Sequence, residues 1–180
     1  VKTVAYELAE SMEWSVPDGV VVPTGTGELL VGLAKGFREL RDLGYVDSVP
    51  PLYAAQPDGC APIAAAIESG ADTVEPWEPP DTICGELEIP DPAGGDLALE
   101  AVRESGGDAV AVDDEDALSS AVTVAHNEAV EMGAAAGVAA AGIWDLRDQF
   151  EKDDTLVVLN TEAGVKTADL LRSHLMGKGM

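Results

Sequence analysis

The segment Pro23-Thr24-Gly25-Thr26-Gly27-Glu28 combines residue types that could hold a phosphate group. It follows a short apolar run and precedes apolar residues at helical spacing, so it predicts a turn from a strand into a helix. A helix N-terminus offers free N–H groups and a dipole that favours an anion. Gly25 and Gly27 permit close backbone approach, and the hydroxyls of Thr24 and Thr26 can donate hydrogen bonds. An ordinary turn stays an open alternative, because the loop is neither a P-loop nor a GxGxxG dinucleotide fingerprint.

A second loop, Asn160-Thr161-Glu162-Ala163-Gly164, follows another apolar run. In an open parallel sheet, ligands bind beyond the carboxyl ends of the strands, which makes the neutral hydroxyl of Thr161 a candidate ligand or a helix cap. Lys166 could form a Schiff base, although a surface lysine is the simpler interpretation. His126 and His174 have no partners at triad or metal-ligand spacing and are interpreted as solvated residues.

The pattern along the chain alternates short apolar runs with helical stripes, which predicts an α/β fold. We expect an open, mainly parallel twisted sheet with helices on both faces. The strands are expected at 20–22, 52–55, 109–112 and 155–159. A helix that begins at the acidic run 113–116 is expected directly after the third strand. The other helices are expected at 3–13, 28–43, 61–67, 97–105, 133–150 and 166–175. Residues 75–92, rich in proline and acid, predict a long surface connection, and the small residues of 133–142 predict close packing against a helix backbone.

The charge balance is strongly acidic, with 34 Asp and Glu against 10 Lys and Arg and a formal net charge of -24. This charge opposes sequence-independent binding to nucleic acid or to an anionic membrane, so we expect neither partner. The acids are interspersed with apolar residues rather than run together, which predicts a charged surface on a folded protein. Two interpretations of this acidic surface stay open. The protein is adapted to high salt, as in a halophilic archaeon, or it is an acidic protein of a mesophile.

The 180 residues, 46% of them hydrophobic, are enough for a single α/β domain spanning 1–180. Cys60 and Cys84 have no neighbouring ligands at metal spacing, so we expect no metal and reduced thiols. No apolar run is long enough for a membrane span and no signal peptide is recognisable, which predicts a soluble, cytoplasmic protein. The chain opens at Val1 without methionine, so it is expected to be a fragment of a longer polypeptide.

The order of several motifs resembles the threonine synthase group of the tryptophan-synthase-β-like, fold type II pyridoxal-phosphate enzymes. Each motif alone is unspecific, but their order and spacing extend over nearly the whole chain. The motifs are Lys2-Thr3-Val4-Ala5-Tyr6-Glu7-Leu8-Ala9-Glu10, Val20-Val21-Val22-Pro23, Lys35-Gly36-Phe37-Arg38-Glu39-Leu40, Gln56-Pro57-Asp58-Gly59-Cys60-Ala61-Pro62-Ile63, Glu104-Ser105-Gly106-Gly107-Asp108-Ala109-Val110-Ala111-Val112, Val130-Glu131-Met132-Gly133-Ala134-Ala135-Ala136-Gly137 and Leu159-Asn160-Thr161-Glu162-Ala163-Gly164-Val165-Lys166.

The resemblance implies pyridoxal 5'-phosphate as cofactor and this chain as the C-terminal, cofactor-holding portion of the enzyme's large domain. Thr161 would hydrogen-bond the pyridine nitrogen, where a neutral hydroxyl does not enforce a protonated ring. The family's Schiff-base lysine would lie upstream of Val1, so the isolated chain is expected to be inactive, with no catalytic residue of its own. The loop that would hold the cofactor phosphate corresponds to Gly25, Thr26, Gly27, Glu28 and Leu29.

For the full-length parent, the resemblance implies a lyase that converts O-phosphohomoserine and water to threonine and phosphate. Its partners would be a small-molecule amino-acid substrate and the missing N-terminal segment of the same enzyme, and a homodimer is left open. A threonine dehydratase, a cysteine synthase or a related ammonia-lyase is the alternative within the family. A non-catalytic domain that binds a phosphometabolite and a purely structural acidic domain are the alternatives of other classes.

Overall fold

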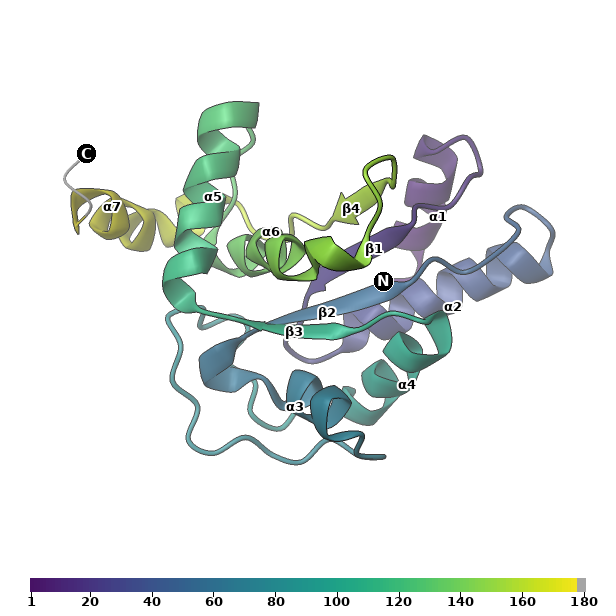
Figure 1. Ribbon diagram of the computed structural model, residues 1–180, viewed down its shortest axis with the longest axis horizontal. Coiled ribbons are helices and arrows are strands. Elements are labelled where there is room, and N and C mark those ends of the chain that lie inside the picture. Colours follow the sequence, from purple (N-terminus) through teal and green to yellow (C-terminus); the bar gives the residue numbers. More distant parts are fainter. Residues whose placement is uncertain (178–180) are drawn as a thin grey trace.

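The computed structural model describes residues 1–177 as a single layer of parallel strands covered by helices on both faces (Figure 1). The strand order is β3-β2-β1-β4, and each neighbouring pair is parallel. The predicted fold class is therefore confirmed. The strands are β1 (Gly19–Pro23), β2 (Leu52–Pro57), β3 (Ala109–Val112) and β4 (Leu156–Val158).

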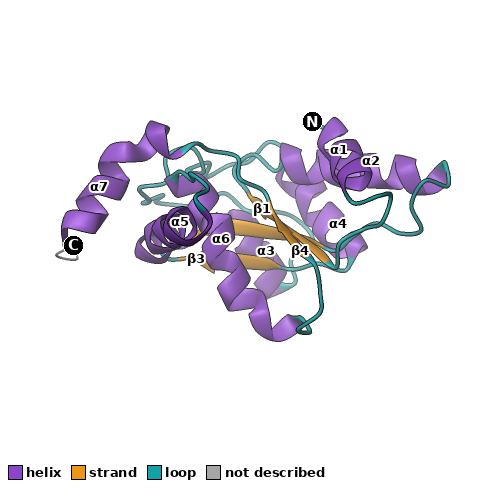
Figure 2. Ribbon diagram, turned by 90° about the horizontal axis from the view of Figure 1, so that it is seen from above, coloured by secondary structure: helices purple, strands orange, loops and turns teal. Residues whose placement is uncertain are grey.

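The helices fall into two groups according to the sheet face that their buried side chains join. The helices on the first face are α1 (Thr3–Ser11), α2 (Glu28–Asp42), α3 (Pro62–Ser69) and α4 (Gly95–Ser105). Those on the second face are α5 (Asp114–Glu128) and α6 (Ala134–Leu146). The last helix, α7 (Ala168–Gly177), has no buried residue and projects from the body at the end opposite to α2 (Figure 2).

The apolar core follows from the alternation of side chains along the strands. On β1, Val20 and Val22 pack with Leu30, Leu33 and the rest of the first-face core, which α1, α2 and α4 complete. Val21 points to the opposite face, where it joins the core formed with α5 and α6. Because β1 lies inside the sheet, its side chains are buried on both faces, as the unbroken apolar run predicts.

Helix ends are set by the residue types expected there. Asp113 caps α5, because its carboxylate accepts the N–H groups of Glu115 and Asp116 at 2.7 and 3.3 Å. Gly70 and Gly106, with left-handed backbone, end α3 and α4. The acidic run that starts at residue 113 thus opens a helix, as predicted.

The small residues of α6 allow α5 to approach its backbone closely, which confirms the packing expected for the 133–142 tract. A Cβ atom at Gly137 would lie 2.3 Å from the carbonyl oxygen of Ala117 and 3.1 Å from the Cβ of Ala121. Figure 1 shows α5 crossing beside α6. The two helices are therefore held at a separation that only glycine permits at this position.

Four expectations need correction. The helix expected at 133–150 ends at Leu146 and continues only as a 3₁₀ turn. The last helix begins at Ala168, after a 3₁₀ turn over Gly164–Thr167. The strand expected at 155–159 is shorter, Leu156–Val158, and is only partly buried, because it is an edge strand with a neighbour on one side only. Residues 75–92 contain no helix or strand, as expected, but they do not lie wholly on the surface, because Cys84 and Leu87 are 2% and 6% exposed.

We expect Gly137→Ala to lower the free energy of unfolding by about 1–3 kcal/mol, because the added methyl group meets the backbone of α5. The matched control is Gly177→Ala, a helical glycine with no heavy atom of the described residues within 4 Å of the added Cβ, which should be neutral or slightly stabilising. Urea denaturation of both variants measures the difference. Equal stability of the two would contradict the close packing of α5 on α6.

Candidate functional site

The carboxyl ends of β1 and β4 bring the two candidate loops to one edge of the sheet. Strand β1 pairs in parallel with β4, with Val20 opposite Val157 and Val21 opposite Val158. Residues 24–28 therefore leave the sheet beside residues 159–164. This is the edge at which open parallel sheets bind ligands.

The loop after β1 presents backbone donors that the protein itself does not use. Among the residues that the structure describes, the N–H groups of Gly25, Thr26, Gly27 and Leu29 donate to no acceptor. The N–H of Glu28 makes one long contact, 3.4 Å, to the hydroxyl of Thr26. The first hydrogen bond closing α2 comes later, from Val31 to Gly27 at 3.1 Å. Unsatisfied donors at the positive end of a helix form an anion site.

Both loop glycines lie close to neighbouring segments, and Gly27 is required by its backbone conformation. Gly27 has φ +84° and a Cβ there would lie 2.7 Å from the Cβ of Ala98. A Cβ at Gly25 would lie 3.1 Å from Ile89 and 3.2 Å from the carbonyl oxygen of Glu86. The loop is thus sandwiched between α4 and the segment 86–89.

Of the two threonines in this loop, only Thr26 is open to a ligand. The hydroxyl of Thr24 is 2% exposed and donates to the carbonyl of Val22 at 2.8 Å, so the expectation that it helps to bind phosphate is wrong. Thr26 is exposed, as is Glu28, whose side chain belongs to the first turn of α2.

A fully buried amide fastens this loop to the neighbouring strand. Gln56 is 0% exposed and its Nε2 donates to the carbonyl of Thr24 at 3.2 Å. Its Oε1 accepts the N–H groups of Ile63 and Ala64 at 2.9 and 3.1 Å. One side chain therefore ties the end of β1 to the start of α3, which keeps the loop in place without a ligand.

The segment 82–89 is a third part of the site, and sequence reasoning missed it. Asp114 at the start of α5 accepts the hydroxyl of Thr82 at 2.6 Å and the N–H of Ile83 at 2.8 Å. Cys84 and Leu87 then insert into the second-face core. The only signal in the sequence was the presence of two apolar residues, Cys84 and Leu87, within an acidic, proline-rich stretch.

The turn that carries Thr161 is fixed on both sides of that residue. The Nδ2 of Asn160 donates to the carbonyl of Glu131 at 2.8 Å. The carbonyl of Glu162 accepts the N–H of Gly133 at 2.8 Å. Thr161 lies between them, is exposed, and has a hydroxyl without a hydrogen-bond partner among the described residues. An unpaired hydroxyl on a fixed backbone suits a ligand contact rather than the helix cap that was the alternative, since the cap position of the next helical turn is Ala163.

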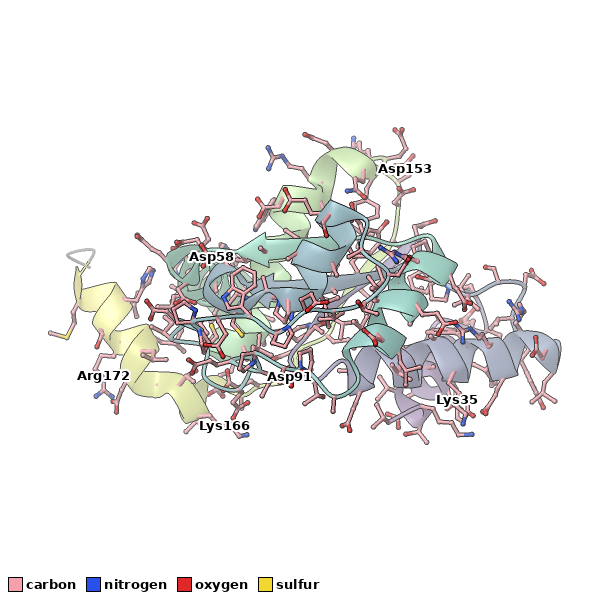
Figure 3. All side chains as sticks on the ribbon, turned by 90° about the horizontal axis from the view of Figure 1, so that it is seen from below. Lys35, Asp58, Asp91, Asp153, Lys166 and Arg172 are labelled. Carbon is pink, nitrogen blue, oxygen red and sulfur yellow. The ribbon has the colours of Figure 1, made fainter. Side chains whose placement is uncertain are left out.

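The remaining polar candidates do not form a catalytic group. Lys166 is exposed, with its ammonium 3.4 Å from Glu86, and Figure 3 shows it at the base of α7. His174 contacts the Ser119 hydroxyl at 3.2 Å, and His126 is exposed near the end of α5. Within residues 1–177 no cluster of three or more His, Cys, Asp or Glu side chains could hold a metal ion. No helix in the described part of the chain is long and apolar enough to cross a membrane.

These features fit a ligand with an anionic end and an aromatic nitrogen. The unused N–H groups of residues 25–29 suit a phosphate, and the free hydroxyl of Thr161 suits a ring nitrogen as acceptor or donor. The carboxylate of the acid beside it, Glu162, accepts the N–H of Ala135 at 2.8 Å. The residues present therefore match the two ends of pyridoxal phosphate.

Both cysteines are free and buried, and burial raises the pKa of Cys84 to about 12, helped by the nearby carboxylate of Asp114. At pH 8 its thiolate fraction is on the order of a thousandfold below that of an exposed cysteine. We expect the folded protein to resist a thiol reagent and the unfolded chain to react at two thiols. Ser173→Cys, at an exposed position, supplies the control that reacts at once. Prompt labelling of Cys84 in the folded protein would contradict its burial.

Several solved structures share this fold. An L-serine ammonia-lyase from Rhizomucor miehei superimposes with a TM-score of 0.74 at 22% identity, covering 96% of this chain and 54% of that one. A serine racemase from maize gives a TM-score of 0.72 at 22% identity, with coverages of 99% and 53%.

Closer relatives are found by sequence. A threonine synthase of Methanosarcina acetivorans is 36% identical over 162 residues, which is 89% of this chain and 40% of that protein. One of Methanocaldococcus jannaschii is 32% identical, over 93% of this chain and 42% of that protein. The chain thus spans less than half the length of these relatives. Residues 1–162 match the family described as pyridoxal-phosphate dependent enzymes. Because this match covers most of the chain, the chain belongs to the family of pyridoxal-phosphate dependent enzymes.

Proposed function

We propose that this chain is the cofactor-holding portion of a threonine synthase, which converts O-phosphohomoserine and water to threonine and phosphate. The sequence relatives named as threonine synthases, at 31–36% identity for the first three, support this substrate class. The solved structures named as lyases, deaminases and racemases are at most 22% identical and bear on the fold alone.

One observation carries the proposal: unused donors of the loop after β1 and the free hydroxyl of Thr161 lie at the ends of adjacent parallel strands. In the proposed site, the N–H groups of Gly25, Thr26, Gly27, Glu28 and Leu29 bind the cofactor phosphate. No Lys or Arg side chain belongs to that loop, so backbone dipoles and the α2 N-terminus stabilise the phosphate charge.

At the other end of the proposed site, Thr161 hydrogen-bonds the pyridine nitrogen and orients the ring. A hydroxyl does not force a protonated nitrogen, as an aspartate would, so the ring is a moderated electron sink. Pyridoxal phosphate supplies the electron withdrawal that lets bonds beside the substrate's amine-bearing carbon break. The residues of this chain bind and orient it, while the segment 82–89 covers one side of the loop.

The lysine that would bond the cofactor and the residues that grip the substrate are proposed to lie in a segment preceding Val1. The isolated 180 residues are therefore proposed to be inactive without that segment. The buried, free cysteines support a reducing, cytoplasmic location.

The activity test uses the full-length protein and measures phosphate release from O-phosphohomoserine. We expect threonine and phosphate in equal amounts. Formation of 2-oxobutanoate from threonine, with no phosphate release, would instead favour a dehydratase. Binding of pyridoxal phosphate or another phosphometabolite without turnover of either substrate would favour the non-catalytic alternative.

Two glycines at opposite ends of α2 give a matched pair of variants. Gly27→Val places a side chain of the proposed phosphate loop against Ala98 of α4. Gly44→Val introduces the same backbone strain, a left-handed φ of +77°, where no neighbouring atom of the described residues lies within 4 Å. We expect Gly27→Val to weaken pyridoxal phosphate binding by at least about tenfold, a loss of roughly 1.4 kcal/mol. Gly44→Val should lower stability by about 1–2 kcal/mol and leave the affinity unchanged. Equal cofactor affinities would contradict the assignment of the loop.

The surface charge supports adaptation to high salt, which we include in the proposal. Among the described residues only one acidic side chain is buried, and in Figure 3 carboxylate oxygens project around the outline of the molecule. We expect the melting temperature to rise as KCl increases from about 0.1 to 2 M, since screening relieves self-repulsion. Each kcal/mol gained raises it by about 2–4 °C in a chain of this size. Sucrose is the control, because it stabilises proteins by exclusion from their surface and does not screen charge. An unchanged melting temperature in KCl would contradict the halophilic assignment.

A further inference from the structure

Glu162 is the only acidic side chain that is buried among the described residues, and it lies next to Thr161. It is 3% exposed, in a protein with 34 acidic residues. Burying a carboxylate is unfavourable unless its oxygens find donors, so such a residue needs a structural or functional reason. The reason lies in what its carboxylate contacts.

The carboxylate reaches across from the turn to the first residues of α6. Its Oε2 accepts the N–H of Ala135 at 2.8 Å. A Cβ at Gly133 would lie 2.3 Å from the same oxygen, so the carboxylate rests on the bare backbone of that glycine. Main-chain pairing of Gly133 with the Glu162 carbonyl adds a second contact on the same residue. Both the backbone and the side chain of Glu162 are therefore attached to the start of α6.

The charged and polar groups facing this carboxylate come from three segments. They are Cys84 and Glu86 on the segment 82–89, Lys166 and Thr167 on the turn before α7, and the N–H of Ala135 at the α6 N-terminus. Burial raises the pKa of Glu162, and Glu86 adds to that rise, whereas the Ala135 hydrogen bond and Lys166 oppose it. An oxygen of the carboxyl group can accept the Ala135 N–H in either protonation state, so the contact does not require a charge.

The pinned carboxylate has a direct consequence for its neighbour. Thr161 is exposed and its hydroxyl has no partner within the described part of the chain, so only the backbone on either side of it limits where the hydroxyl points. On one side this limit comes from Asn160 and on the other from Glu162. Loss of the Glu162 carboxyl contact would leave this side of the turn attached to α6 by the main-chain bond to Gly133 alone, which loosens the turn around Thr161.

We propose that Glu162 is a positioning residue, whose carboxyl contact with the α6 N-terminus aims the Thr161 hydroxyl at the ring nitrogen of the cofactor. This inference rests on the proposed cofactor site. In this inference Glu162 has a structural role, and the hydroxyl of Thr161 alone contacts the ring nitrogen.

The test uses full-length protein loaded with pyridoxal phosphate labelled with ¹⁵N in the ring. The ¹⁵N resonance reports the hydrogen bond at the nitrogen, and the ³¹P resonance reports the phosphate loop. Thr161→Val defines the ¹⁵N shift for loss of the contact. We expect Glu162→Ala to move the ¹⁵N resonance most of the way to that position while the ³¹P resonance stays in place. Glu162→Gln keeps an acceptor for Ala135 and should retain the wild-type ¹⁵N shift.

If Glu162→Ala does not fold, Glu162→Asp takes its place, because a side chain one methylene shorter cannot reach Ala135 from the same turn. A wild-type ¹⁵N shift in the folded Ala or Asp variant, with Thr161→Val shifted, would overturn the role of Glu162 alone. If the wild-type protein binds the cofactor and the Thr161→Val variant has the same ¹⁵N shift as the wild type, the proposed nitrogen contact is wrong. This inference is then wrong with it. A Gln variant that shifts as far as the Ala variant would also overturn it, because the acceptor would then not be what positions the turn.

Discussion

The parallel pairing of β1 with β4 is the contact on which the rest of the site depends. Sequence separates Gly25 from Thr161 by most of the chain, but adjacent parallel strands bring their carboxyl ends to one edge. Each loop is then fixed locally: Gln56 ties the end of β1 to α3, and Glu162 ties the turn after β4 to α6. The two halves of the site are held by different side chains but aligned by one strand pair.

The charge of the protein places a second constraint on such a site. A phosphate must bind to a chain of net charge -24, and the loop that we assign to it contains no basic residue. Backbone N–H groups bind a phosphate only at hydrogen-bond distance. The repulsion from distant surface carboxylates is screened by salt, so these donors can still stabilise the phosphate charge. Buried carboxyl groups must be kept from that ligand, and Glu162 faces α6 instead.

The fold and part of the site could be predicted from sequence because their signals are local. The run of three valines marks β1, and Asp113 at a helix start marks α5. Gly25 and Gly27 sit where a strand-to-helix turn requires them. Thr161 could be singled out only through its place after an apolar run and through the family resemblance.

What could not be predicted depends on contacts between distant segments. Nothing in the residues around Cys84 indicates that Asp114, 30 positions later, anchors this stretch beside the loop. An acid such as Glu162 is normally interpreted as surface, and its burial depends on the bare backbone of Gly133. The inward turn of Thr24 likewise follows from a carbonyl two residues away that sequence patterns do not reveal.

The most direct test of the central claim is a crystal structure of the full-length protein with bound pyridoxal phosphate. The account predicts the phosphate within hydrogen-bond distance of the N–H groups of residues 25–29, and the ring nitrogen at the hydroxyl of Thr161. A phosphate bound away from this loop, or a ring nitrogen facing the carboxylate of Glu162, would contradict it.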